Sequence, residues 1–421
     1  MMPAARRGAG AQPLALAWAV AIGFVSGLAS VGVRLMLTLL QWIFVRHTGL
    51  LPEAAAALSP VRRLLTPMLG AVCATVVLWA VRRWSKASCF EEYVEAVRFE
   101  GGRIPFASTF WRTVSSAFSL ATGAAIGREG SMIQFAAAVS SWIGEHSPVR
   151  SIPRAQQVAC GVAASVAAAY HAPLAGVFFA MEVVLGSWEW RRLPQLLFAS
   201  TAGWLASYIV LGGGPLFLVH GVLSFSWQAL WALPLALALG VIGPLYQASL
   251  RGLRFAGRWP LALVWGGMVV GALSLLRTEV WGNGDAALLH VLSGSATLSS
   301  IAVILVLRMF ATAFCVGTGT IGGVFTPTLF AGAALGLALG HLLQLPDPLL
   351  LAVVGLSALL AVVTHAPVMA ALMAVELTGQ WHLLPLLLLL DVAASRMALT
   401  ISPRSLYAIA TPTPIEEVAV S

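Results

Sequence analysis

A glycine-broken segment occurs twice in this chain, once in each half. Residues 122–134 read TGAAIGREGSMIQ and residues 318–330 read TGTIGGVFTPTLF. In both, Thr-Gly and then Ile-Gly precede a short glycine-bounded break and an apolar run. Glycine interrupts a helix and lets the backbone approach a ligand closely. The chain is therefore constrained to place two similar helix breaks inside a single fold.

A second matched pair follows the first at nearly the same distance. Residues 170–182 read YHAPLAGVFFAME and residues 364–376 read THAPVMAALMAVE, each with Glu nine positions after the proline. Gly127 precedes His171 by 44 residues, and Gly323 precedes His365 by 42. Two hydrophobic halves with glycine- and proline-interrupted segments in corresponding places indicate an inverted-repeat transporter. We expect repeats at about 14–212 and 227–410.

Composition supports a membrane protein independently of the repeats. Of 421 residues, 59% are hydrophobic and 10% are charged, and the mean hydropathy is +0.89. A soluble globule needs more polar surface than this. We predict an all-α polytopic membrane protein. Several apolar runs, such as 131–143 and 366–377, are shorter than the ~20 residues that cross a bilayer, so they should meet other segments within it.

The net charge of +8 does not indicate a nucleic-acid partner. Most basic residues cluster in short stretches between apolar runs, for example in 82–86 and 251–258, as expected for cytoplasmic loops next to a lipid bilayer. Arg34 is different, because it interrupts a long apolar run near the N-terminus. We expect it to pair with backbone or with a neighbouring helix.

Enzyme and metal-site motifs are missing from the sequence. It contains neither HExxH nor GxSxG, which disfavours an intramembrane metalloprotease or serine hydrolase. His171 and His365 each precede Ala-Pro at a predicted helix start and lack clustered partners. We therefore expect no enzyme activity, no metal site and no cofactor.

Arg128 and Glu129 form the most conspicuous charged pair in an apolar setting. An ionisable residue within a membrane segment is a functional-site hypothesis by default. A helix restarting at Gly130 would aim free N–H groups forward, and such a helix end binds anions. A Glu129 carboxylate held at helix N-terminal amides would occupy the place of an anion, so we predict that it is a gate. The alternative, a structural ion pair with Arg128, is disfavoured because adjacent helix residues do not face each other.

These motifs resemble those of a known family. GREGSMIQ at 127–134 looks like the GREGP-type motif of the ClC chloride channels and chloride/proton exchangers, and GGVFTP at 322–327 resembles their GxFxP motif. The similarity spans nearly the whole chain. Further segments resemble the bacterial ClcB branch, whose members are of the voltage-gated type: RLLTP at 63–67, YVEAV at 93–97 and WGNG at 281–284.

The resemblance implies a fold and a function. It implies the ClC fold with two inverted repeats, a homodimer with one pore per subunit, and cytoplasmic N- and C-termini. The function implied is a chloride channel of the bacterial inner membrane, gated by pH or voltage through Glu129, that acts as an electrical shunt in acid stress. A proton-coupled chloride or fluoride antiporter is the alternative. Fourteen residues follow Tyr407, so we expect no cytoplasmic regulatory domain.

The resemblance also implies anion ligands. The amides of Val324 and Phe325 would coordinate the ion, together with the phenol of Tyr407 and the helix start at Gly130. Partial positive charges at helix ends bind anions reversibly, which suits rapid conduction. An ungapped count from YVEAV places Ser88 at the serine of the family's central anion site, although residues 87–92 also read as a polar loop.

One departure from the family pattern separates the channel from the exchanger. Chloride/proton exchangers of this family carry a Glu-Glu pair late in the helix that matches residues 176–184, and the second glutamate passes protons. Here the pair reads Glu182-Val183. In an α-helix, a one-residue shift turns a side chain by about 100°, so Glu182 should not replace the missing group. We therefore predict passive or loosely coupled chloride conduction.

Overall fold

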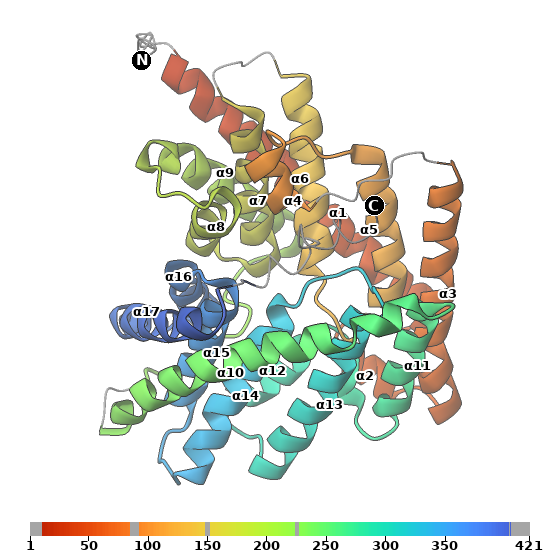
Figure 1. The fold of residues 1–421 in the computed structure, drawn as a ribbon, viewed down its shortest axis with the longest axis vertical. Coiled ribbons are helices and arrows are strands. Elements are labelled where there is room, and N and C mark those ends of the chain that lie inside the picture. Colours follow the sequence, from red (N-terminus) through yellow and green to blue (C-terminus); the bar gives the residue numbers. More distant parts are fainter. Residues whose placement is uncertain (1–10, 85–91, 148–151, 224–226, 404, 406–421) are drawn as a thin grey trace, which may run out of the picture. The chain divides into compact units, whose positions relative to one another are not determined.

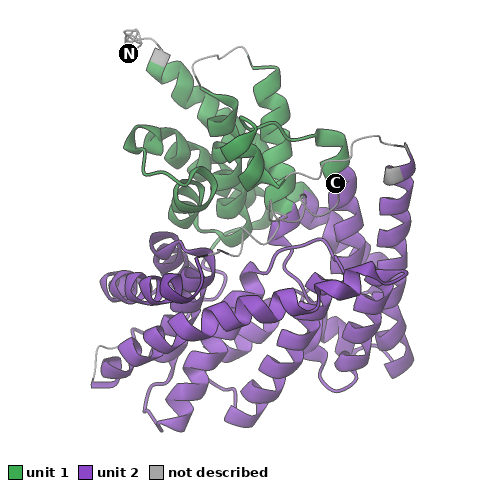
Figure 2. Ribbon diagram, in the orientation of Figure 1, with its two compact units in different colours: residues 1–32, 89–109, 132–214 green, residues 33–88, 110–131, 215–421 purple. Residues whose placement is uncertain are grey.

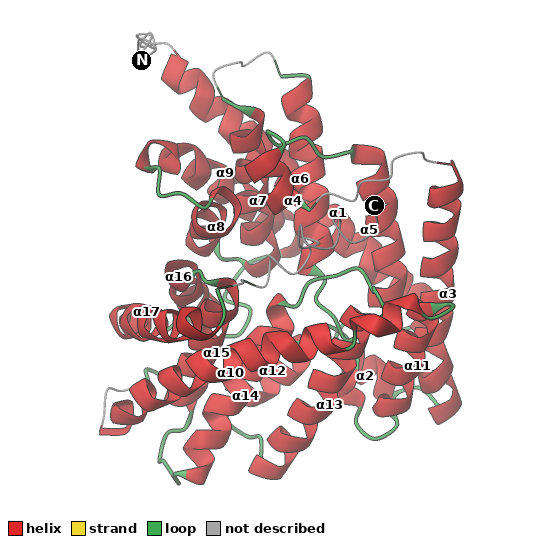
Figure 3. Ribbon diagram, viewed as in Figure 1, coloured by secondary structure: helices red, strands yellow, loops and turns green. Residues whose placement is uncertain are grey.

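The computed structural model describes residues 11–84, 92–147, 152–223, 227–403 and 405, and these residues form helices joined by short loops (Figures 1 and 3). Within these ranges the only β-pairing is one isolated bridge. The α-helices are α1 (Ala11–Val45), α2 (Leu51–Ala56), α3 (Pro60–Trp84), α4 (Tyr93–Phe99), α5 (Phe106–Ala121), α6 (Glu129–Glu145), α7 (Arg154–Tyr170), α8 (Pro173–Phe179), α9 (Leu193–Leu211), α10 (Ala232–Gly252), α11 (Ala262–Ser274), α12 (Asp285–Leu292), α13 (Leu298–Gly317), α14 (Phe325–Leu342), α15 (Leu349–Thr364), α16 (Pro367–Thr378) and α17 (Leu384–Ile401). Short 3₁₀ or π segments are η1 (Ala180–Leu185), η2 (Trp190–Arg192), η3 (Trp227–Trp231), η4 (Arg254–Arg258), η5 (Thr278–Val280) and η6 (Trp381–Leu383).

Seven helical stretches among the described residues are long and apolar enough to cross a membrane, which confirms the predicted polytopic all-α class. Others are apolar but short, as the sequence predicted, among them α11, α15 and α16. Every residue of α15 after the first is buried, so the helix is surrounded by protein. A short helix that is enclosed in this way leaves no broken end facing lipid.

The chain divides into two compact units, coloured separately in Figure 2. Unit 1 comprises residues 1–32, 89–109 and 132–214, and unit 2 comprises residues 33–88, 110–131 and 215–421. Each unit draws on both early and later parts of the chain. Sequence neighbours are therefore separated and distant segments are brought together within each unit.

Unit 1 packs its helices through small residues. A Cβ placed on Gly23 would lie 2.2 Å from the carbonyl oxygen of Ala199, so the backbones of α1 and α9 touch there. The buried hydroxyl of Ser26 lies 2.8 Å from that of Ser140. Close backbone approach and paired hydroxyls hold helices together where lipid supplies no hydrophobic driving force.

In unit 2, small residues likewise allow close packing, here between α14 and α15. A Cβ on Gly332 would lie 2.2 Å from the carbonyl oxygen of Gly355, and a Cβ on Gly355 would lie 2.2 Å from that of Gly332. The two glycines thus allow direct backbone contact. α14 begins at the glycine-broken segment, so this contact anchors one side of the candidate site.

The two His-Ala-Pro turns have the same backbone geometry. The residue that caps the C-terminus of α7 is His171, with φ 55° and ψ 34°, and the one that caps α15 is His365, with φ 56° and ψ 34°. Each is a left-handed helix end at a non-glycine residue. The proline two positions later opens the next helix, α8 or α16, where its fixed φ suits the first turn. The sequence match between the halves therefore extends to backbone conformation.

Candidate functional site

The candidate site is built on the two Thr-Gly turns, which are alike in hydrogen bonding. α5 ends at Ala121, and the Thr122 hydroxyl donates to carbonyls three and four residues back, at 3.1 and 2.8 Å. α13 ends at Gly317, and the Thr318 hydroxyl does the same at 3.2 and 2.9 Å. The glycine that follows each threonine has positive φ. Each helix is thus capped by its own threonine before the chain turns.

The breaks meet at a pair of glycines that occupy matching places in the two segments. Gly127 N–H donates to the Gly323 carbonyl at 2.5 Å, and Gly323 N–H donates to the Gly127 carbonyl at 2.7 Å. A Cβ on Gly130 would lie 2.5 Å from the Gly323 nitrogen. Gly130 and Gly323 face each other's backbone and leave no room for a side chain, whereas a Cβ on Gly127 would meet the side chain of Glu129.

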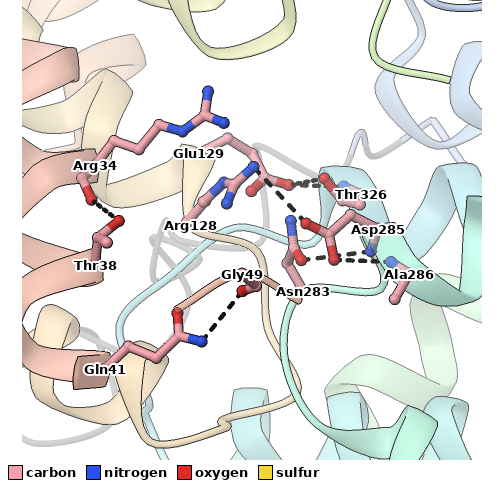
Figure 4. A network of polar contacts seen from close by, with 10 residues as sticks. All are labelled: Arg34, Thr38, Gln41, Gly49, Arg128, Glu129, Asn283, Asp285, Ala286 and Thr326. Atoms are coloured by element: carbon pink, nitrogen blue, oxygen red, sulfur yellow. Dashed lines mark hydrogen bonds and ion pairs between the residues drawn. The ribbon is translucent and has the colours of Figure 1, made fainter. Parts of the chain in front are cut away.

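Glu129 is the first residue of α6, one position earlier than the predicted helix start at Gly130. Its side chain is buried, with 2% of its surface exposed. Oε1 accepts hydrogen bonds from the backbone N–H of Thr326 at 2.8 Å and from its hydroxyl at 2.5 Å (Figure 4). Thr326 is the second residue of α14. The carboxylate therefore occupies a helix N-terminus, as predicted, but the helix is α14 and not the one that follows Glu129 in sequence.

Arg128 faces a different carboxylate. Its Nη2 lies 3.8 Å from Asp285 Oδ2, at the start of α12. Figure 4 shows Arg128 and Glu129 directed to separate partners. This agrees with the expectation that the adjacent pair does not form a structural salt bridge. Asp285 is thus a contributor to this region that sequence reasoning had not identified.

Arg308 was also missed, although a lone arginine in the apolar run of α13 is a signal for an intramembrane functional or structural residue. It is 2% exposed. Its guanidinium donates to the carbonyls of Glu279 at 2.5 Å and Gly282 at 2.9 Å, and more weakly to that of Val280 at 3.3 Å. Arg308 therefore fixes the loop that leads to Asp285.

The other predicted anion ligands are placed as follows. Val324 is the N-cap of α14 and Phe325 is its first residue, 5% exposed. Together with Glu129 and Gly130 they gather around the two paired glycines. Ser88 and Tyr407 lie outside the described residues. The structure thus brings four predicted site residues together, and their ligand roles remain predictions.

In unit 1, the segment around Val183 differs from its expected geometry. Residues 180–185 form the π-helix η1, so the 100° step expected between Glu182 and Val183 does not apply. The Val183 side chain is buried, with 4% exposed. Arg98 of α4 donates to the carbonyls of Val183 at 2.6 Å and Val184 at 3.3 Å. Val183, the position that the resemblance assigns to the exchangers' proton glutamate, is therefore apolar, and its backbone carbonyl binds a guanidinium.

Comparison of the sequence with known proteins finds relatives that span almost the whole chain. A family model described as "Voltage gated chloride channel" matches residues 73–399. The "Voltage-gated ClC-type chloride channel ClcB" of Citrobacter koseri is 36% identical over 410 residues, covering 92% of this chain and 97% of that protein. The protein of the same name from Escherichia coli strain K12 is 38% identical over 411 residues, covering 92% and 96%.

Solved structures show the same fold. A slow cyanobacterial Cl⁻/H⁺ antiporter gives a TM-score of 0.81 at 23% identity, covering 94% of this chain and 96% of that one. A CLC-type fluoride/proton antiporter gives 0.76 at 20% identity, covering 94% and 97%. With the family model matching most of its length, the chain belongs to the ClC family of voltage-gated chloride channels and their relatives, on the ClcB branch.

Proposed function

We propose that this protein is a chloride channel gated by Glu129. The observation that carries the proposal is the Glu129 carboxylate on the N-terminal amide and hydroxyl of Thr326. Helix N-termini are anion sites because their N–H groups lack intrahelical acceptors and the helix dipole favours negative charge. A side chain in that position competes directly with a permeating anion.

The gating chemistry follows from charge. The deprotonated carboxylate holds the amide of Thr326 and excludes chloride. A protonated carboxyl is neutral, so it binds the helix end more weakly and leaves a site of partial positive charge. Chloride then meets amides of α14, including those of Val324 and Phe325, and no full cation that would slow its release. Acid should therefore open the path.

Passive conduction is favoured by the apolar side chain at Val183. A valine cannot carry a proton, so no group at that position delivers protons to Glu129. We also propose, from the family resemblance, that the channel is a homodimer in the bacterial inner membrane and serves as an electrical shunt in acid stress.

A second candidate is a proton-coupled chloride or fluoride antiporter. The likeness of the fold to that of two antiporters favours it. Water or another side chain would then have to carry the proton that Val183 cannot.

Reconstituted liposomes under imposed chloride and pH gradients distinguish the two. A channel should carry a chloride flux that follows the electrochemical gradient of chloride, rises on acidification and moves no protons uphill.

Variants test the gate in the same liposomes. Glu129→Gln should raise chloride flux at neutral pH and abolish the acid response. Glu145→Gln, at the exposed far end of α6, should leave both unchanged. Uphill proton movement at a fixed ratio to chloride would establish the antiporter, and a wild-type pH response in Glu129→Gln would remove Glu129 as the gate.

A further inference from the structure

A cavity of about 260 Å³ lies in unit 2 beside Arg128. Its wall includes Arg128, the residue immediately before Glu129. The other polar side chains on the wall come from α1, from the loop before α12 and from the first residue of α12: Arg34, Thr38, Gln41, Asn283 and Asp285. The rest of the wall is apolar apart from Gly49: Leu37, Leu50, Leu51, Leu120, Ala121 and Ile126. The cavity therefore combines several hydrogen-bonding side chains, two of them arginines, with an apolar wall.

Arg34 does not have the partner that the sequence led us to expect. Among the described residues, its guanidinium has no hydrogen-bond acceptor and no carboxylate within ion-pair distance, and the Thr38 hydroxyl bonds only the backbone carbonyl of Arg34. Figure 4 shows its side chain extending from α1 on the same side as Arg128. A partly buried cation without a counterion is costly within a membrane segment, so such a residue points to a ligand.

The charges on the wall do not cancel. Arg128 is paired with Asp285 at 3.8 Å, which leaves the charge of Arg34 without a counterion. The side chains that line the cavity therefore carry a net charge of +1. Both Arg128 and Asp285 are near enough to act on Arg34 electrostatically. One monovalent anion would neutralise the group. Guanidinium, Thr and Gln side chains can all donate hydrogen bonds to it.

The size and the donors define the ligand class. A cavity of this volume holds a small anion with several waters, and a water needs only ~30 Å³. Guanidinium groups bind halides by charge and planar oxyanions by paired N–H donors. The wall therefore suits chloride or nitrate that is still partly hydrated.

We propose that this cavity is an anion-docking site that delivers the ion to the Glu129 gate, with Arg34 as its principal cation. The proposal rests on the proposed anion conduction and adds a second binding step before the gate. A local positive charge raises the concentration of anions at the entrance, and this acts on the entry rate at low anion concentration. At saturating chloride, passage through the gate limits flux.

The test is the chloride dependence of flux in liposomes. Arg34→Gln should raise the half-saturating chloride concentration about tenfold, because one cation at close range is removed, while the maximal rate stays the same. Arg34→Lys keeps the charge and should stay within about threefold of wild type. Asp285→Asn frees Arg128 and should lower the half-saturating concentration. Arg62→Gln, which removes an exposed arginine of α3 outside the cavity, is the matched control.

A direct binding measurement separates this proposal from the proposed function. Crystals soaked in bromide should show anomalous density between the guanidiniums of Arg34 and Arg128, and Arg34→Gln crystals should lose it. Conducting wild-type protein whose half-saturating concentration is equal in Arg34→Gln and Arg62→Gln would overturn the docking site. Bromide bound in a protein that does not conduct would instead overturn the proposed channel and leave the docking site standing.

Discussion

The carboxylate of Glu129 and the backbone amide of Thr326 are 197 residues apart in sequence and 2.8 Å apart in space. A second bond, from the Thr326 hydroxyl, reaches the same oxygen. The hydroxyl bond depends on a side chain and can be removed by mutation, whereas the amide bond depends on where α14 begins.

Thr326→Val keeps the shape and the amide but removes the hydroxyl bond. A hydrogen bond to a charged group contributes about 1.5–3 kcal/mol, so the deprotonated gate should be held less firmly. Opening then needs less acid, and the midpoint of acid activation should move to higher pH. Chloride flux from liposomes between pH 4 and 8 measures this. Thr328→Val, which removes a hydroxyl that bonds Val324 and Tyr246, is the control, and equal midpoints for both variants would contradict the prediction.

Gly127→Ala should open the gate without touching Glu129. A Cβ at this position would lie 2.3 Å from Glu129 Oε1 and 2.6 Å from Oε2. These atoms end a flexible side chain, so the carboxylate should move away. Flux should become high and independent of pH, as expected for Glu129→Gln. In Gly130→Ala the new Cβ meets backbone, 2.5 Å from the Gly323 nitrogen, and folding should fail instead. Wild-type pH dependence in Gly127→Ala would refute this account.

Arg308→Met should destabilise the protein strongly. Methionine fills much of the same space as the arginine stem but has no N–H groups. The carbonyls of Glu279 and Gly282 therefore lose their buried donor. Each unsatisfied buried group costs about 1–3 kcal/mol, so a loss of several kcal/mol is expected. Thermal unfolding in detergent should show a clear fall in Tm relative to Arg277→Met, an exposed control. An unchanged Tm would show that the loop does not depend on Arg308.

Val183→Glu should introduce proton coupling. The new carboxyl would stand at the exchangers' proton position, and the guanidinium of Arg98, already bonded to the carbonyl of this residue, can compensate its charge. Proton uptake driven by a chloride gradient should exceed that of wild type, while Glu182→Gln should show no change. Folded Val183→Glu protein without extra proton flux would mean that this position alone does not decide between channel and exchanger.

Local features of the site could be predicted from the sequence because they repeat. The Thr-Gly turns and the His-Ala-Pro turns have matched spacing, and each pair adopts matched geometry. These conformations depend on a few neighbouring residues, on threonine capping and on proline at a helix start. The same reasoning located Glu129 as a buried carboxylate near a helix end.

Long-range partners could not be predicted in this way. Thr326 and Asp285 have no local signal that identifies them as partners of Glu129 and Arg128. The carbonyls that Arg308 binds belong to a loop whose approach depends on tertiary packing.

The glutamates nine residues after each proline also diverge despite equal spacing. Glu376 lies in the regular helix α16, whereas Glu182 lies in the π-helix η1. Arg98 binds two carbonyls of η1, which is a tertiary contact without a counterpart in the local sequence.

The reciprocal hydrogen bonds between Gly127 and Gly323 have a kinetic consequence. They join the backbone two residues before Glu129 to the backbone three residues before Thr326. Glu129 and the Thr326 amide that it accepts from are therefore held at a fixed backbone distance. A hinge or helix displacement at this point would have to break both bonds, and such collective motions take microseconds to milliseconds. Rotation of a single side chain needs no such rearrangement. For the proposed Glu129 gate, opening should therefore be a change of one rotamer, and the open and closed states should share a superimposable main chain.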